Sequence, residues 1–353
     1  MKLDITAIDK NFLNGSIFEK EGLVWKSITE SPFKIYGLAV CEGEDFFRLP
    51  DALAKQVSEG VYNLSKHTAG GRVRFRTDSK RIALSCVPRN EGFMSHMPLS
   101  GSAGIGIYVN GEFISTVRPA NGDGVRFEGA IETEGILRDV ELYLPLYNGI
   151  TELKIGLCEG SNLLEPRPYT VEKPVVYYGS SITQGGCASK PGNSYQGFVS
   201  RWLDSDHINL GFSGNAKGEP IMAEYIAGLE MSAFVLDYDH NAPNAEHLKA
   251  THEQFFEIIR KANPTLPIII ASKSDTDGAK RADADKRRAV IEQTYNNAIR
   301  NGDRHVYYID GRKLFGEQDR CDCTMDGAHP NDLGFYRMAQ AFYPVIKQAL
   351  TEA

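Results

Sequence analysis

The second half of the chain alternates short apolar runs with amphipathic helical patterns, and few folds accommodate that order. The strand-like runs occupy residues 175–179, 207–212, 233–239, 267–272 and 305–310. Amphipathic stretches such as AEHLKATHEQFFEIIRKA lie between them, and a further one, DLGFYRMAQAFYPVIKQAL, lies near the C-terminus. Strict alternation of strands and helices favours a parallel, doubly wound sheet with helices on both faces. We therefore predict a three-layer α/β/α domain of flavodoxin-like type.

The first half has the pattern of antiparallel strands. Between residues 33 and 165, short alternating runs such as GIGIYV and DVELYL are separated by Gly and Asn turns. Asn110 and Gly111 lie between two such runs, and this dipeptide is a strong signal for a two-residue hairpin. Many short strands at this spacing predict an all-β sandwich, which we expect to be jelly-roll-like.

One of these runs, RVRFRT, also predicts which side chains are exposed. Val73 and Phe75 alternate with arginines, which is the period of a half-exposed strand. We therefore expect the arginines of this strand to form a solvated face, namely Arg72, Arg74 and Arg76.

The two patterns meet at a Pro-rich segment, EPRPYTVEKP, at residues 165–174. A chain of 353 residues is long enough for two domains, each with a core of its own. We predict a β-sandwich domain at residues 1–170 and an α/β domain at residues 171–353.

Charge and hydropathy argue against several classes of function. Lys and Arg number 39 against 46 Asp and Glu, and a formal charge of −7 disfavours nucleic acid or an anionic membrane as a partner. No apolar stretch is long enough to span a bilayer, and the N-terminal segment lacks the apolar core of a signal peptide. We expect a soluble, cytoplasmic protein, and the sequence leaves its oligomeric state open.

The cysteines predict neither a disulfide framework nor a metal centre. Six cysteines in so long a chain do not form the dense pattern of a disulfide scaffold. Cys321 and Cys323 form a lone CxC without a second pair at zinc spacing. We therefore expect no bound metal.

Four polar segments of the second half contain the groups that ester hydrolysis requires. Three follow predicted strands: GSSITQGG with Ser181, GFSGNAKGEP with Gly214, and DYDHNAP with Asn241. The fourth, DGAHPNDLGF, precedes the last helix and contains Asp326 and His329. Because ligands bind at the carboxyl ends of the strands in such sheets, we expect these segments to meet there.

Each of these residues suits one step of acyl transfer. A serine hydroxyl such as that of Ser181 needs a base, and an imidazole with a pKa near ~6.5 can accept its proton. Asp326 lies three residues before His329 and can orient the ring. The backbone N–H groups of Ser181 and Gly214 and the side-chain amide of Asn241 can donate to an oxyanion. No cofactor is required.

The four segments, in this order, resemble the blocks of the SGNH (GDSL-type) hydrolase family. GSS at residues 179–181 resembles the family's G-D-S with Ser in place of Asp, and DGAH at residues 326–329 matches its D-x-x-H. Gly214 and Asn241 correspond to the glycine and the asparagine of the second and third blocks. The resemblance covers residues 172–353 and extends to a subgroup with an N-terminal β-domain.

The third block departs from the family pattern G-x-N-D. Asp239 stands where the family has Gly, and Ala242 stands where it has Asp. Two histidines are further candidates for contact with substrate: His240 beside the block, and His96 in the glycine-rich segment SHMPLSGSAG.

The resemblance implies a serine esterase that forms an acyl-enzyme. The loops of the second half are rich in Gly, Ser, Asn and Asp and show no apolar lid, so we expect a short acyl ester, such as an acetyl ester, on a carbohydrate. Alternatives are a lipase, lysophospholipase or thioesterase of the same fold, or a noncatalytic glycan-binding protein. The G-x-S-x-G, H-E-x-x-H and G-x-x-x-x-G-K-[ST] motifs are absent.

Overall fold

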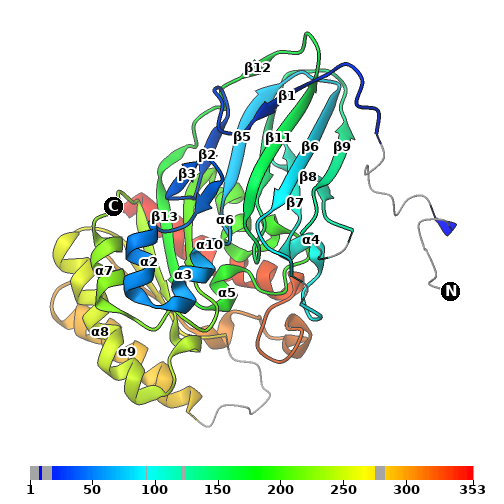
Figure 1. The fold of residues 1–353 in the computed structure, drawn as a ribbon. Helices are drawn as coiled ribbons and strands as arrows, with labels where there is room; N and C mark the ends of the chain where they lie inside the picture. Colours follow the sequence, from blue (N-terminus) through cyan, green and yellow to red (C-terminus); the bar gives the residue numbers. More distant parts are fainter. Residues whose placement is uncertain are drawn as a thin grey trace.

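In the computed structural model, antiparallel sheets from the first half stand beside a parallel sheet from the second half (Figure 1). The structure describes residues 8–9, 18–92, 94–120, 122, 124–274 and 283–352. Residues 1–7 and 10–17 of the predicted first domain therefore lie outside the described residues.

The first half is a β-sandwich, as predicted. One sheet has the order β1 (Leu23–Ser27), β11 (Ile150–Cys158), β6 (Arg81–Pro88) and β9 (Phe127–Glu132). The other has the order β12 (Leu163–Leu164), β5 (Arg72–Thr77), β10 (Arg138–Tyr143), β7 (Ile105–Val109) and β8 (Glu112–Val117), with β2 (Lys34–Tyr36) also paired to β5. Buried residues of both sheets, such as Phe75 and Leu84, form one apolar cluster. A separate pair consists of β3 (Val40–Glu42) and β4 (Asp45–Phe47).

The Asn-Gly hairpin is confirmed. Asn110 has φ 49° and Gly111 has φ 82°, so both central residues of the turn are left-handed. This is the conformation of a type I′ turn, whose twist matches that of the strands it joins, β7 and β8.

The second half contains the predicted doubly wound parallel sheet. Its order is β14 (Ser205–Gly211), β13 (Val171–Gly179), β15 (Ala233–Asp237), β16 (Ile268–Ala271) and β17 (Val306–Ile309). Apolar side chains cover both faces, because Val176 and Tyr178 belong to one buried cluster and Val175 and Tyr177 to the other. The first cluster takes side chains from α7 (Pro220–Ala227), α8 (Ala245–Ala262) and α9 (Ala284–Arg300). The second takes them from α6 (Tyr195–Leu203) and α10 (Asp332–Glu352).

The strand order has its switch point at β13. The chain passes from β13 to β14 on one side and then to β15 on the other, so the direction of winding reverses at β13. In open α/β sheets ligands bind outside the carboxyl ends of the strands at such a switch point. Among the described residues, no helix is long and apolar enough to cross a membrane.

Two helices of the first half, which the sequence analysis did not predict, pack on the α/β half. These are α2 (Asp51–Val57) and α3 (Glu59–Ser65), which stand next to α7 in Figure 1. Ala54 and Val61 belong to the same buried cluster as Val176 of β13. A further short helix, α4 (Leu99–Ser102), precedes β7. The first half therefore contributes to the core of the second.

Arg48 joins the two halves by hydrogen bonds to four main-chain carbonyls. Its guanidinium donates to Leu64 and His67 of the first half and to Asn209 and Gly211 of β14, and its side chain is buried. A buried cation is costly unless its donors are satisfied, so these bonds fix the position of β14 against residues 64–67.

The prediction that the arginines of β5 are solvated is wrong for two of them. Arg72 is 0% exposed and pairs with Asp206 of β14 and with Glu141. Arg74 is 9% exposed, and its guanidinium lies 3.8 Å from the ring centre of Tyr169. Alternation revealed the two faces of the strand, but it could not reveal that the α/β half and the segment before it cover the polar face.

Candidate active site

Ser181 lies where β13 ends and a single helical turn, α5 (Ser181–Gln184), begins. The hydroxyl of Ser180 accepts a hydrogen bond from the backbone N–H of Ile182 at 3.1 Å, which caps this turn. Ser181 is the first residue of the turn, and its hydroxyl points to a different partner, His329. The hydroxyl of Ser180 therefore caps the helical turn, whereas the hydroxyl of Ser181 bonds to His329.

Gly179 is required for this tight passage from strand to helix. A Cβ atom at this position would lie 2.0 Å from the hydroxyl oxygen of Thr183 and 2.3 Å from the carbonyl oxygen of Asp237. Any side chain would push α5 away from the end of β15.

The structure brings together Ser181, His329 and Asp326. The Ser181 Oγ lies 2.9 Å from the His329 Nε2, although the two residues are 148 positions apart in the chain. On the other side of the ring, the Nδ1 of His329 lies 2.8 Å from the Oδ2 of Asp326. Because an ionised carboxylate can only accept, Nδ1 carries the proton and Nε2 faces the serine hydroxyl as an acceptor.

Hydrogen bonds within the loop keep Asp326 ionised. Partial burial acts to raise the pKa of this carboxyl group, but the backbone N–H and the ring of His329 and the backbone N–H of Ala328 outweigh it. They lower the pKa of Asp326 to about 2. The carboxylate is therefore available to orient the imidazole at any pH at which the ring is neutral.

The loop that holds Asp326 and His329 is closed on itself before α10 begins. The backbone N–H of Met325 donates to the carbonyl of His329 at 2.9 Å, and Thr324 forms a β-bridge with Pro330. The side chain of Asn331 donates to the carbonyl of Asp322. These bonds set the spacing that the D-x-x-H segment requires.

Gly214 and Asn241 meet at the same edge of the sheet. Gly214 follows β14 and has φ +68°, and Asn241 ends a single 3-10 turn, η3 (Asp239–Asn241), that follows β15. The Oδ1 of Asn241 accepts from the backbone N–H of Gly214 at 3.1 Å, and its Nδ2 donates to the carbonyl of Phe212 at 2.8 Å. The two candidate oxyanion donors are therefore bonded to each other in this structure.

Asp239, where the sequence departs from the family pattern, holds two loops together. It is 0% exposed, and its carboxylate accepts from the backbone N–H of Lys273 after β16 at 2.9 Å. The side chain thus ties the loop after β15 to the loop after β16. The departure from Gly does not displace Asn241 from Gly214.

The two candidate histidines lie in different elements. The ring centre of His96 lies 6.2 Å from that of His329, and the side chain of His96 is exposed. A residue from the first half therefore lies beside His329, and its contact with substrate stays a prediction. His240 lies within η3, next to Asn241, and is half-buried.

Sequence reasoning missed two residues that hold the nucleophile turn. The hydroxyl of Tyr147, from the first half, donates to the backbone carbonyl of Ser181 at 3.0 Å. The Oε1 of Gln184 accepts from the backbone N–H of Ser213 at 3.0 Å, and its Nε2 donates to the carbonyl of Leu146 at 3.1 Å. Gln184 belongs to the segment GSSITQGG, so it had a local signal, whereas Tyr147 had none.

The described residues contain no group of three or more His, Cys, Asp or Glu side chains that could hold a metal ion. The cysteines are free thiols, including Cys321 and Cys323.

Comparisons with known proteins identify the family and the fold of the chain. Residues 172–347 match the GDSL-like Lipase/Acylhydrolase family, and residues 23–163 match the family described as the N-terminus of Esterase_SGNH_hydro-type. A candidate GDSL-like lipase from Bacteroides ovatus has 28% identity and a TM-score of 0.83, covering 93% of this chain and 98% of that chain. No curated protein sequence matches the chain.

Two further solved structures share the fold at lower identity. The salicylyl-acyltransferase SsfX3 from a tetracycline biosynthetic pathway has 21% identity and a TM-score of 0.77, covering 94% of this chain and 98% of that chain. The acetyl xylan esterase Est2A from the rumen bacterium Butyrivibrio proteoclasticus has 14% identity and a TM-score of 0.59, covering 93% of this chain and 99% of that chain.

Proposed function

Because the chain belongs to the GDSL-like lipase and acylhydrolase family of ester hydrolases, we propose that it is a serine esterase with Ser181 as its nucleophile. The observation that carries this proposal is the continuous hydrogen-bonded series from the Ser181 Oγ through both nitrogens of His329 to Asp326. A p-nitrophenyl acetate assay tests it, and a protein without turnover would support the noncatalytic glycan-binding alternative.

The proposed reaction follows the geometry of the three side chains. The Ser181 Oγ attacks the acyl carbonyl carbon while the His329 Nε2 takes its proton, and Asp326 stabilises the resulting imidazolium. The tetrahedral intermediate collapses to an acyl-enzyme as His329 returns the proton to the departing alcohol. A water molecule then attacks the acyl-enzyme, with His329 as base, and releases the acid and free Ser181.

The oxyanion is stabilised by the three groups named from the sequence. The backbone N–H of Ser181 begins α5 and has no acceptor in a preceding helical turn. The Nδ2 of Asn241 has a second N–H beyond the one that bonds the Phe212 carbonyl. The N–H of Gly214, which donates to the Oδ1 of Asn241 in this structure, donates to the oxyanion instead when substrate is bound.

Replacing Asn241 with alanine should lower kcat by roughly 10² to 10³ with little change in KM, because an oxyanion donor acts mainly in the transition state. Steady-state kinetics on p-nitrophenyl acetate measure this. Asn244→Ala is the matched control, since Asn244 lies in the same loop but caps α8 by accepting from the His247 N–H. Asn244→Ala should lower the free energy of unfolding by about 1 kcal/mol and leave kcat unchanged. An effect of Asn241→Ala on KM alone would assign the residue to substrate binding.

We infer that the substrate is a short acyl ester, most simply acetyl, on a carbohydrate. The loops at the carboxyl edge of the parallel sheet carry small and polar side chains, which suit sugar hydroxyls better than a long acyl chain. The acetyl xylan esterase with the same fold supports this choice by analogy.

A series of acyl chain lengths tests the acyl preference. We expect kcat/KM on p-nitrophenyl esters to fall about tenfold or more from acetyl to butyryl, and further to octanoyl. A small acyl pocket loses binding free energy when added methylenes do not fit. A maximum at octanoyl would favour the lipase alternative.

A further inference from the structure

A cavity of about 620 Å³ lies between the two halves of the protein, beside the nucleophile turn. Most of its lining comes from the first half, including Asn63, His67, Asn90 and Tyr147, and the second half contributes Ser213 and Asn215. Its volume is within the usual range for ligand sites.

Two lining residues connect this cavity to the proposed catalytic centre. The Tyr147 hydroxyl is bonded to the carbonyl of Ser181, and Ser213 directly precedes Gly214. An ester whose carbonyl lies between Ser181 and Gly214 would therefore have the cavity next to it. A substituent on that ester could enter the cavity without moving the reacting atoms.

Hydrogen bonding determines the tautomer of His67 in the cavity wall. The Oε1 of Gln184 must face the backbone N–H of Ser213, which can only donate, so its Nε2 faces the His67 Nδ1 at 3.1 Å. The Nδ1 of His67 is then the acceptor, and the proton is on Nε2. Burial and the neighbouring Arg48 lower the pKa of His67 to about 3, so the ring is neutral.

The Nε2–H of His67 is available to a ligand in the cavity. The part of the chain that the structure describes offers this N–H no acceptor, and His67 lines the cavity. Asn63 and Asn90 are exposed and add amide groups that can both donate and accept. Glu91 is the one carboxylate or cation among the described lining residues. The lining thus suits a neutral ligand with many hydroxyl groups.

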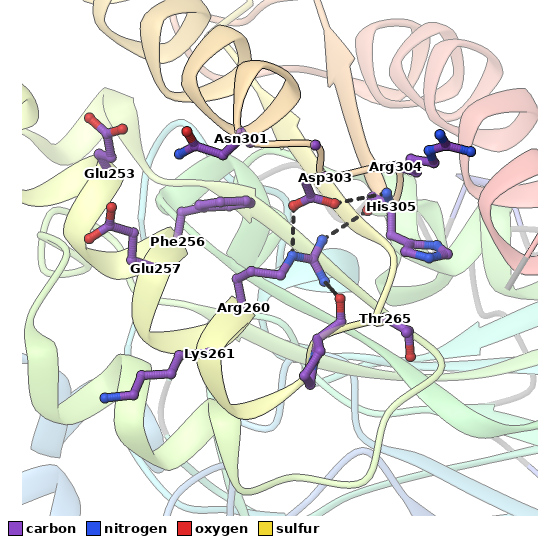
Figure 2. Close-up of a pocket in the computed structure, with 13 residues that line it drawn as sticks. Glu253, Phe256, Glu257, Arg260, Lys261, Thr265, Asn301, Asp303, Arg304 and His305 are labelled. Carbon is purple, nitrogen blue, oxygen red and sulfur yellow. Dashed lines mark hydrogen bonds and ion pairs between the residues drawn. The ribbon is translucent and has the colours of Figure 1, made fainter.

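A second cavity, of about 680 Å³, has a different chemistry and a different place (Figure 2). It is lined by charged side chains, including Glu257, Lys261 and the ion pair of Arg260 with Asp303. Thr265 and His305, which also line it, precede β16 and β17, so it lies at the amino edge of the sheet, away from Ser181. It serves as a matched control for substitutions in the first cavity.

We propose that the cavity between the halves binds the saccharide portion of the ester, with His67 Nε2–H as a donor to a sugar hydroxyl. This assignment rests on the proposed esterase function, and it makes the first half part of the substrate site. The saccharide, rather than the acyl group, occupies the cavity because amide and imidazole groups line it.

Two variants test the assignment. His67→Phe keeps an aromatic ring but removes the donor, and Asn63→Trp fills the cavity from an exposed position on α3. For each, kcat/KM on acetylated xylo-oligosaccharides should fall about tenfold or more, mostly through KM, as expected for a lost hydrogen bond or blocked site. On p-nitrophenyl acetate, which has no saccharide, kcat/KM of Asn63→Trp should stay within about twofold. His67→Phe also removes an acceptor of the Gln184 Nε2, which keeps its bond to the Leu146 carbonyl, so its loss on the oligosaccharides should exceed its loss on p-nitrophenyl acetate.

The control variant is Asn301→Trp, a likewise exposed asparagine in the cavity of Figure 2, and its kcat/KM on both substrates should stay unchanged.

Calorimetry gives a readout that does not depend on turnover. Ser181→Ala protein should bind deacetylated xylo- or cello-oligosaccharides, and adding Asn63→Trp should abolish that binding. If the wild-type protein had no esterase activity but still bound the oligosaccharides, and Asn63→Trp abolished this binding, the esterase function would be refuted and the cavity assignment would stand. Equal losses on both substrates, unchanged kinetics on the oligosaccharides, or binding that survives Asn63→Trp would overturn the cavity assignment.

Discussion

Replacing Ser181 with alanine should reduce kcat on p-nitrophenyl acetate by on the order of 10⁶, to the residual rate that binding and oxyanion donors alone provide. The loss is large because no acyl-enzyme can form without the hydroxyl that lies 2.9 Å from the His329 Nε2. The hydrogen bond described for the Ser181 hydroxyl is the one to His329, so removing this oxygen should change the fold little. Single-turnover kinetics with purified variant protein measure the residual rate.

The adjacent serine is the matched control. Ser180→Ala removes the hydroxyl that caps α5 through the Ile182 N–H, which should cost about 1 kcal/mol of stability. Catalysis should persist in this variant, since Ser180 has no bond to His329 among the described contacts. If Ser181→Ala retained turnover and Ser180→Ala lost it, the nucleophile would be Ser180.

Replacing Asp326 with asparagine should lower kcat by about 10⁴. The carboxylate keeps the proton of His329 on Nδ1, whereas an amide can donate to Nδ1 and move the proton to Nε2. The Nε2 atom could then no longer accept the proton of Ser181. Substrate binding does not depend on the tautomer, so KM should change far less than kcat.

Asp332→Asn separates this effect from a general loss of a carboxylate. Asp332 begins α10 three residues after His329 and accepts from the backbone N–H and the hydroxyl of Ser189. Because it contacts neither Ser181 nor His329 in the described structure, its replacement should leave kcat within about tenfold. Comparable losses in the two variants would mean that Asp326 supports the loop and does not orient the base.

The sequence was sufficient for features that depend on local chain geometry. Period-2 and period-3.6 patterns reflect which face of a strand or helix is buried, so the sandwich strands and the alternating strands and helices of the second half were predictable. The Asn110 and Gly111 turn depends on the φ preferences of those two residues. Asp326 and His329 lie within one loop, so their spacing already indicated contact.

The approach of Ser181 to His329 was predictable only indirectly, from the rule that the carboxyl ends of parallel strands share one edge. The pairing of Gly214 with the Oδ1 of Asn241 required the actual positions of two loops. Neither the local sequence pattern nor the spacing shows which backbone N–H the Oδ1 of Asn241 accepts from.

Contacts between the two halves were decided by the tertiary structure alone. The sequence shows that Arg72 alternates with apolar residues, but only the position of Asp206 on β14 shows that its guanidinium is buried. Likewise, Tyr147 reaches the carbonyl of Ser181, and His67 faces Gln184, across an interface with no sequence period. The physical reason is that periodicity records whether a side chain leaves water, while its partner depends on how separately formed layers pack.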